Sequence, residues 1–312
     1  MKRFLTYCLS VFFTLSVFAQ QDPQVSMNMF NHMTINPGYA GSNEAICLTA
    51  IQRQQWMGFE GSPMTTIFEV NTPINPINSG IGLSIYNDEI GNETDLSLKV
   101  SYAYRLEVGM GKLGMGLSFG LLNKAFDENW VATDDPNSDP KIPGKDSRMG
   151  FDAGFGLFYR TNDIYLGLSS THLTQQEIKF PEQDNIAKVT EVRHYYITSG
   201  YNYQLPANPL IELRPSVLIK SDFTSSQFDI NLMGIYNKRF FGGVSFRAGS
   251  FDALIAMLGM QLKNNLRFAV AYDLNMSKLS NYNSGSLEIM VGYCFNIIFI
   301  KNQGGNKSVR WL

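Results

Sequence analysis

The chain has 312 residues, a formal net charge of −2 and 17% charged residues, below the roughly 25% of ordinary soluble domains. This charge balance gives no electrostatic reason to expect a nucleic acid or an anionic lipid surface as a partner. Glycine is plentiful, at 27 residues, and aromatic residues make up 13%. Beyond the first residues, the sequence contains no apolar run near the roughly 18 residues of a membrane helix, so any membrane crossing would use strands.

The first residues predict export. A basic start at residues 2–3 precedes an apolar stretch over 4–18, and Val17 and Ala19 occupy the −3 and −1 positions of a cleavage site before Gln20. This is the anatomy of a secretory signal peptide, which is too short and wrongly flanked to be a membrane helix. We therefore expect residues 1–19 to be removed from the mature protein.

Period-two alternation runs along almost the whole mature chain. Large apolar side chains alternate with small or polar ones over 113–121, and the same alternation recurs over 266–272 and 287–295. Two residues is the side-chain period of a β-strand. The pattern predicts strands near 44–57, 64–72, 79–88, 94–106, 112–125, 150–161, 163–172, 191–205, 210–223, 226–237, 239–249, 252–263, 265–276 and 285–297.

These segments predict an all-β fold, a transmembrane antiparallel up-and-down β-barrel of about 14 strands over residues 44–297. An even strand number returns both ends of a barrel to one side. The long connections 127–149 and 173–190 both fall at odd positions, where external loops belong, and the even connections are short. A soluble all-β protein shows the same alternation, so the period alone leaves that alternative open.

Closure of the barrel would place the first strand beside the last. Cys47 and Cys294 would then both lie toward the periplasmic rim, where a disulfide is conceivable in an oxidising compartment. Two unpaired buried thiols are the commoner arrangement, and the sequence favours that interpretation over a bridge. Residues 298–312 are expected to form a short, solvated tail.

Three patterns that resemble chemical motifs favour ordinary structural explanations. The run Gly109–Gly114 matches G-x-G-x-x-G, but a strand follows where a phosphate-binding helix should begin. His172 and His194 stand near carboxylates, yet no hydrolase or metalloprotease motif surrounds them, which favours solvated rim histidines. The acidic loop Asp134–Asp139 lacks the glycine and terminal glutamate of an EF-hand and is expected to be a solvated loop. The sequence thus predicts no enzyme, no cofactor and no metal site.

The segment 20–43 differs from the rest of the mature chain. It is rich in large apolar side chains, has no clean period two and contains the turn signal Asn36-Pro37-Gly38. Such a segment, placed at the periplasmic end, is expected either to plug the lumen or to dock a partner.

At this segment the sequence resembles the PorP/SprF family, outer-membrane proteins of the type IX secretion system of Bacteroidetes. The resemblance begins at Gln21-Asp22-Pro23-Gln24 and Asn36-Pro37-Gly38-Tyr39-Ala40-Gly41-Ser42. It continues through Arg53–Phe59, Gly80–Ser84, Tyr102–Leu106, Tyr165–Ser169 and Glu288–Met290, across essentially the whole mature chain. The family pattern often has alanine where this chain has Gly38.

The resemblance implies a non-enzymatic component of type IX secretion, and of gliding motility in some members. Such a protein would bind or anchor a periplasmic ring lipoprotein, or the C-terminal domain of an exported surface adhesin. Both ends of the chain would be periplasmic, and no small-molecule substrate is expected. The alternative is a plugged 14-strand barrel that transports small apolar molecules. The candidate partner-binding residues are Asp22, Pro23, Gln24, Phe30, Asn36, Pro37, Tyr39, Arg53, Gln54, Gln55 and Trp56.

Overall fold

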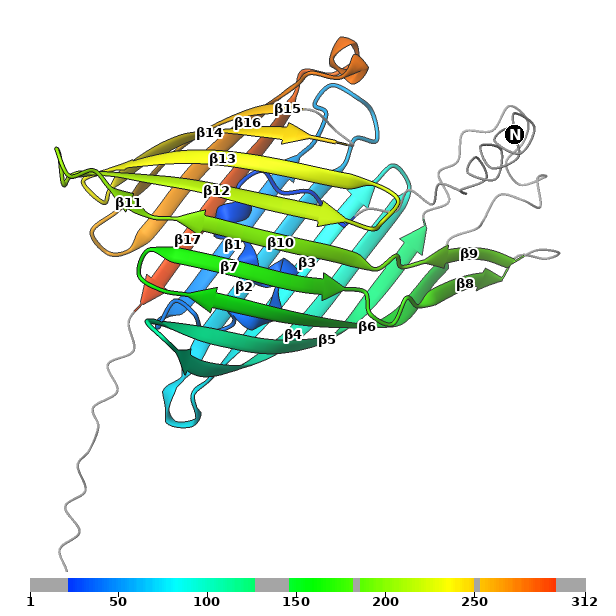
Figure 1. The fold of residues 1–312 in the computed structure, drawn as a ribbon. Coiled ribbons are helices and arrows are strands. Elements are labelled where there is room, and N and C mark those ends of the chain that lie inside the picture. Colours follow the sequence, from blue (N-terminus) through cyan, green and yellow to red (C-terminus); the bar gives the residue numbers. More distant parts are fainter. Residues whose placement is uncertain (1–21, 127–145, 182–185, 250–252, 296–312) are drawn as a thin grey trace, which may run out of the picture.

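A computed structural model describes residues 22–126, 146–181, 186–249 and 253–295. Fourteen antiparallel strands close into a barrel (Figure 1). They are β1 (Ile46–Gln54), β2 (Met64–Ile74), β3 (Ser79–Ile90), β4 (Glu93–Val108), β5 (Gly111–Phe126), β6 (Asp146–Arg160), β7 (Ile164–Thr171), β10 (His194–Tyr201), β12 (Ile211–Ser221), β13 (Ser226–Tyr236), β14 (Phe240–Ala248), β15 (Ala253–Gln261), β16 (Leu266–Asn275) and β17 (Ser286–Phe295).

Two long-range pairings complete the ring. The first strand, β1, pairs antiparallel with the last, β17, from Ile46 opposite Phe295 to Gln54 opposite Leu287. Strand β10 pairs with β12, and the two-residue β11 (Tyr203–Gln204) extends the edge of β12. Closure pairs the backbone groups of every wall strand on both sides, which a strand in lipid requires. The predicted strand number and the predicted seam between first and last strands are confirmed.

The two faces of the wall differ as a membrane barrel requires. Phe119, Val100 and Leu258 point outward and are 66%, 54% and 73% exposed, whereas Lys99, Ser101 and Ser118 on the alternate positions are buried. A soluble sandwich would bury the large apolar face instead. The outward apolar face therefore excludes the soluble all-β alternative and gives the barrel a lipid-facing surface.

The strand ends define two rims. The rim where β1 begins and β17 ends carries the six connections 75–78, 109–110, 161–163, 202–210, 237–239 and 262–265, and we call it the disulfide rim for the cysteines described below. The opposite rim carries a separate two-stranded hairpin, β8 (Glu177–Pro181) and β9 (Ile186–Thr190), and we call it the hairpin rim (Figure 1). The sequence predicted a loop at 173–190, because five-residue strands outside the wall leave little periodic signal.

The helical residues are few and short. Three one-turn elements, η2 (Asn28–Phe30), α2 (His32–Ile35) and η3 (Pro37–Tyr39), lie inside the ring (Figure 1). Two more, η4 (Asn75–Ile77) and η6 (Lys278–Asn281), lie in connections. Among the described residues, no helix is long and apolar enough to cross a membrane. The predicted signal peptide, the acidic loop Asp134–Asp139 and the tail 298–312 lie outside the described residues.

Candidate functional site

The segment Asp22–Ala45 crosses the lumen from one rim to the other. Its first described residue, Asp22, contacts His172 and Tyr196 at the hairpin rim. Its last part contacts Arg160 and Lys112 at the disulfide rim, immediately before β1 begins. Most of its side chains between these ends are buried against the inner wall.

This crossing separates the two ends of the described chain. Asp22 lies at the hairpin rim, whereas Phe295 ends β17 at the disulfide rim. The prediction that both termini are periplasmic concerns residues outside the described ranges and stays a prediction. The sequence argument counted wall strands alone, and the passage of the segment through the lumen adds one further crossing.

A network of buried charges holds the segment near the hairpin rim. The backbone N–H groups of Ser26 and Met27 donate to the Glu288 carboxylate at 2.7 and 2.8 Å, and the Ser26 hydroxyl donates to Asp273. Arg53 donates to the Ser26 hydroxyl and forms ion pairs with Asp273 at 2.7 Å and Glu288 at 3.1 Å. The network thus ties the segment to β1, β16 and β17 at once.

A second arginine extends this network toward β13 and β14. Arg247 pairs with Asp229 at 3.0 Å and with Asp273 at 3.4 Å, and it donates to the Val25 carbonyl. Buried charges are costly to desolvate, and a carboxylate left without its partner costs several kcal/mol more. The segment backbone is therefore part of the solvation of these buried ions.

Close backbone contact holds the middle of the segment. A Cβ atom at Gly116 would lie 2.3 Å from the Pro37 carbonyl carbon, and one at Gly114 would lie 2.1 Å from the Gly38 carbonyl oxygen. The Asn36 amide accepts from the Gly38 N–H and donates to the Leu157 carbonyl. The small side chains on the inner face of β5 make room for η3, which explains why that strand alternates glycine with large residues.

Aromatic side chains surround the same turn. His32, Tyr39, Phe158 and Tyr165 pack with ring centroids 5.0 to 5.8 Å apart. The His32 imidazole is buried and packs as an aromatic group. On the other side of the segment, the Phe30 ring packs tilted against Phe241 and lies beneath the Arg267 guanidinium.

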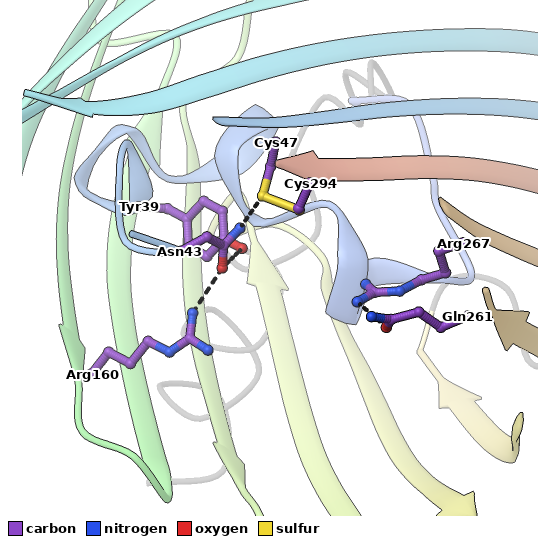
Figure 2. Close-up of a disulfide and its surroundings, with 7 residues drawn as sticks. All are labelled: Tyr39, Asn43, Cys47, Arg160, Gln261, Arg267 and Cys294. Atoms are coloured by element: carbon purple, nitrogen blue, oxygen red, sulfur yellow. Dashed lines mark hydrogen bonds between the residues drawn. A yellow bond between two sulfur atoms is a disulfide. The ribbon is translucent and has the colours of Figure 1, made fainter. Parts of the chain in front are cut away.

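The disulfide rim is closed at its seam. Cys47 and Cys294 stand opposite each other in the β1–β17 register and form a disulfide, with Sγ atoms 2.07 Å apart (Figure 2). The interpretation as two unpaired thiols is therefore wrong, because closure brings their Cα atoms to 4.2 Å, a separation that the sequence does not specify. Beside the bridge, Asn43 accepts from Tyr39 and Arg160, and Glu44 accepts from Arg105 and Lys112.

Several cavities open at the disulfide rim between the segment and the wall, and two of them share three arginines. One, of about 280 Å³, is lined by Tyr39, Arg160, Arg214 and Arg267 among others. The other, of about 470 Å³, shares these three arginines and adds Lys238. Figure 2 shows Arg160 and Arg267 on either side of the disulfide. We call this region the arginine-lined mouth.

Charge is uneven around this rim. Basic side chains in the described turns and strand ends outnumber acidic ones: Arg105, Lys112, Arg160, Arg214, Lys238, Arg239, Lys263 and Arg267 stand against Glu44, Glu107, Asp163 and Glu212. Some of these charges are paired, as Arg214 is with Glu212. The remaining excess makes the mouth a surface that attracts acidic groups.

Asp22 closes the hairpin-rim end of the lumen. Its carboxylate accepts from Thr171, His172 and Tyr196, and Lys220 donates to its backbone carbonyl. Burial favours the neutral acid, but the charges of His172, His194 and Lys220 prevail and hold the pKa of Asp22 well below its usual range. Burial also opposes a charged His172, but Asp22 raises its pKa to about 9.

The histidines overturn one expectation. His172 is 1% exposed and His194 3%, so neither is a solvated rim residue. They end up buried because the start of the lumen segment covers them, a contact between residues about 150 positions apart. The G-x-G-x-x-G run behaves as predicted, with Gly109 in a left-handed turn between β4 and β5.

The structure separates the predicted partner-binding residues into two groups. Asp22, Gln24, Asn36 and Tyr39 contact the wall from inside the lumen, and Pro23, Phe30 and Pro37 belong to the same segment. Arg53 also points inward. The stretch Gln54–Trp56 lies at the hairpin rim, where Gln54 bonds Ser62 and the Trp56 N–H donates to Ser286. Partner contact through any of these residues stays a prediction.

The arginines of the mouth were missed as partner candidates. Arg160, Arg214 and Arg267 are spread over β6, β12 and β16, and only barrel closure brings them to one opening. The available signal was weak: each stands within a few residues of a short even-numbered turn, so all three belong to the same rim.

Fold and site together define an outer-membrane β-barrel whose lumen is occupied by its own N-terminal segment. The sequence places this barrel more narrowly. Residues 17–293 match the family described as type IX secretion system membrane protein PorP/SprF, and the chain belongs to that family. It is therefore a membrane component of type IX secretion.

Solved structures of other outer-membrane proteins are similar to this chain at low sequence identity. A monoaromatic hydrocarbon channel, CymD, superposes with a TM-score of 0.52 at 10% identity, covering 86% of this chain and 93% of that one. The Acinetobacter baumannii outer membrane protein Omp33 gives a TM-score of 0.48 at 6% identity, covering 80% and 99%. A search of curated proteins finds no match.

Proposed function

We propose that this barrel is a non-catalytic anchor that holds another protein of the secretion machinery at the arginine-lined mouth. Its disulfide rim would face the periplasm, because short turns mark the periplasmic side of bacterial barrels. The partner would be a periplasmic ring lipoprotein or the C-terminal domain of an exported adhesin, and it would present acidic groups to the mouth.

One observation carries this proposal. The lumen segment is tied to the wall along its length, yet it leaves cavities at the disulfide rim lined by Arg160, Arg214 and Arg267. Arginine is enriched at the energetic centres of interfaces, since its guanidinium binds carboxylates through two parallel hydrogen bonds. A filled barrel with a basic opening is suited to hold a partner.

Transport of small apolar molecules is the second candidate function. The similarity to a hydrocarbon channel is a similarity of fold alone and does not support this function. The lumen contains Arg53, Arg247, Asp229, Asp273 and Glu288, all 1% exposed or less. An apolar solute would have to displace the segment that satisfies these charges, at high energetic cost. These charges favour the anchor.

The test is affinity capture from detergent-solubilised outer membranes. The variant Arg160→Glu/Arg214→Glu/Arg267→Glu should lose the partner that the native barrel retains, because the new carboxylates would repel the acidic groups of the partner. The matched control Lys179→Glu/Lys188→Glu reverses exposed lysines on the β8–β9 hairpin and should retain it. Equal capture by both variants would refute docking at the mouth. Capture of no protein by the native barrel, with lipid uptake lost in its deletion strain, would favour transport.

A further inference from the structure

Asp22, His172 and His194 converge at the hairpin-rim end of the lumen. Each offers a ligand atom, and these three atoms lie within 4.8 Å of one another. Among the described residues, this is the group of histidine and carboxylate side chains whose spacing could hold a metal ion. The three come from distant parts of the chain: Asp22 begins the described lumen segment, His172 follows β7 and His194 begins β10. We propose that they form a binding site for a divalent transition metal of the zinc class.

The free nitrogen of His194 is the first argument. Its Nδ1 lies 2.9 Å from the Val192 carbonyl and 3.9 Å from the Asp22 carboxylate, and the bond to the carbonyl requires a proton on Nδ1. The neutral imidazole then carries a lone pair on Nε2, and Nε2 is buried with no partner among the described residues. A buried lone pair without a donor is a costly arrangement, which a metal ion would relieve.

The surroundings of His172 supply the second argument. Its Nε2 lies 2.6 Å from the Asp22 carboxylate, and its Nδ1 lies 3.2 Å from the carboxylate of Asp152. A carboxylate behind the remote nitrogen is the usual support of a metal-binding histidine. His194 has the corresponding support from a backbone carbonyl. The Asp152 carboxylate thus lies behind His172 as it does behind many metal-binding histidines, and the metal would replace the proton between His172 and Asp22.

Charge and access fit a cation. A cavity of about 150 Å³ adjoins Asp22 and His194 and is lined by the carboxylates Asp88, Glu93, Asp95 and Glu191. The lysines nearby are already engaged: Lys99 with Asp152, Lys124 with Asp95 and Glu191, and Lys220 with the Asp22 carbonyl. The acidic cavity gives a metal ion a favourable path to the three ligands.

The donor set selects the metal. Two imidazoles and one carboxylate suit zinc, copper or nickel, whereas calcium and magnesium take oxygen ligands. Tetrahedral zinc bonds of roughly 2.0 to 2.2 Å place ligand atoms about 3.4 Å apart, so the widest present spacing must close by about 1.4 Å. His172 Nε2 and the Asp22 carboxylate, now 2.6 Å apart, must separate to admit the ion. Bound metal would fix the start of the lumen segment to the ends of β7 and β10.

The test uses the full-length barrel in detergent, freed of metal with a chelator and titrated calorimetrically with zinc chloride. We expect one zinc per chain, and no comparable binding of calcium chloride. His194→Ala should abolish stoichiometric binding, and Asp152→Asn should weaken it roughly 10- to 100-fold. Glu177→Gln changes an exposed carboxylate on the β8–β9 hairpin of the same rim, outside the cluster, and should bind as the native protein does.

Each variant is first checked for barrel formation by its heat-dependent migration on a gel. Should His194→Ala fail to fold, X-ray absorption at the zinc edge of the native protein decides, with two imidazole ligands expected. No stoichiometric zinc binding, or binding retained by folded His194→Ala, would overturn the proposal and leave an ion pair between His172 and Asp22. Equal binding of calcium would overturn it as well.

Discussion

Replacing Arg53 with methionine tests whether the lumen segment is held by the buried charges. In the native protein this guanidinium lies 2.7 Å from Asp273, 3.1 Å from Glu288 and 2.8 Å from the Ser26 hydroxyl. Both carboxylates are 1% exposed or less. Methionine keeps much of the side-chain volume and removes the charge, so Arg53→Met leaves two buried carboxylates short of a partner.

The expected loss follows from what remains. Removing one partner of a buried ion pair costs roughly 3–5 kcal/mol. Glu288 keeps the N–H groups of Ser26 and Met27, and Asp273 keeps Arg247 at 3.4 Å. Because these bonds remain, we expect the free energy of unfolding to fall by about 3 kcal/mol, the lower end of that range. Arg148→Met is the matched control: its side chain is 42% exposed, and its pair with Asp146 should contribute at most about 1 kcal/mol.

The assay is equilibrium unfolding in guanidinium chloride, with the barrel in detergent micelles and strand content followed by circular dichroism. Limited proteolysis at low denaturant reports separately on the lumen segment, which should become cleavable in Arg53→Met before the wall unfolds. If Arg53→Met costs no more than Arg148→Met, the network does not stabilise the segment. If Arg53 instead contacts a partner protein, Arg53→Met should leave the free energy of unfolding nearly unchanged and should lose partner capture.

Three further predictions address other parts of the account. Gly116→Val should expel the segment, because even a Cβ there lies 2.3 Å from the Pro37 carbonyl carbon; a barrel that folds while its segment resists protease would contradict the close packing. Cys294→Ser should lower the free energy of unfolding by roughly 2–5 kcal/mol yet still give a closed barrel, since strand pairing also closes the seam; a variant as stable as the native protein would show that the bridge contributes nothing. In chelator-treated protein, the stability that His172 contributes should be complete below pH 6.5 and lost as the pH rises through about 9, because its pKa is raised in the fold. The difference in unfolding free energy between the native protein and His172→Gln should therefore be larger at pH 6 than at pH 9.5, and a constant difference would contradict the ion pair with Asp22.

The wall of the barrel was predictable because its signal is local. Every strand between lipid and lumen must alternate two kinds of side chain, so the period appears in the sequence at each crossing. All fourteen wall strands lie within about four residues of their predicted bounds, as expected of boundary errors. The placement of Cys47 opposite Cys294 followed from closure, whereas the bond itself depends on an approach of a few ångströms that periodicity does not report.

The interior was not predictable in the same way. Arg53 alternates like any lumen-facing residue, and only the fold shows that its partners are Asp273 and Glu288, more than 200 positions away. The sequence predicted a solvated His172 because the residues that cover its side chain are distant from it in the sequence. Contacts between a non-periodic segment and a closed wall have no repeating pattern, so sequence reasoning could expect a plug or a docking segment but could not place it.

The central claim, partner docking at the arginine-lined mouth, is tested most directly by photo-crosslinking in living cells. A photoreactive amino acid is placed at Asn162 or Lys238 on the disulfide rim, and at Phe223, an exposed residue of the hairpin rim, as the matched position. The account predicts one discrete protein adduct from the disulfide-rim positions, absent when Arg160, Arg214 and Arg267 are changed to glutamate. An adduct formed only from Phe223, or adducts unaffected by the arginine changes, would contradict it.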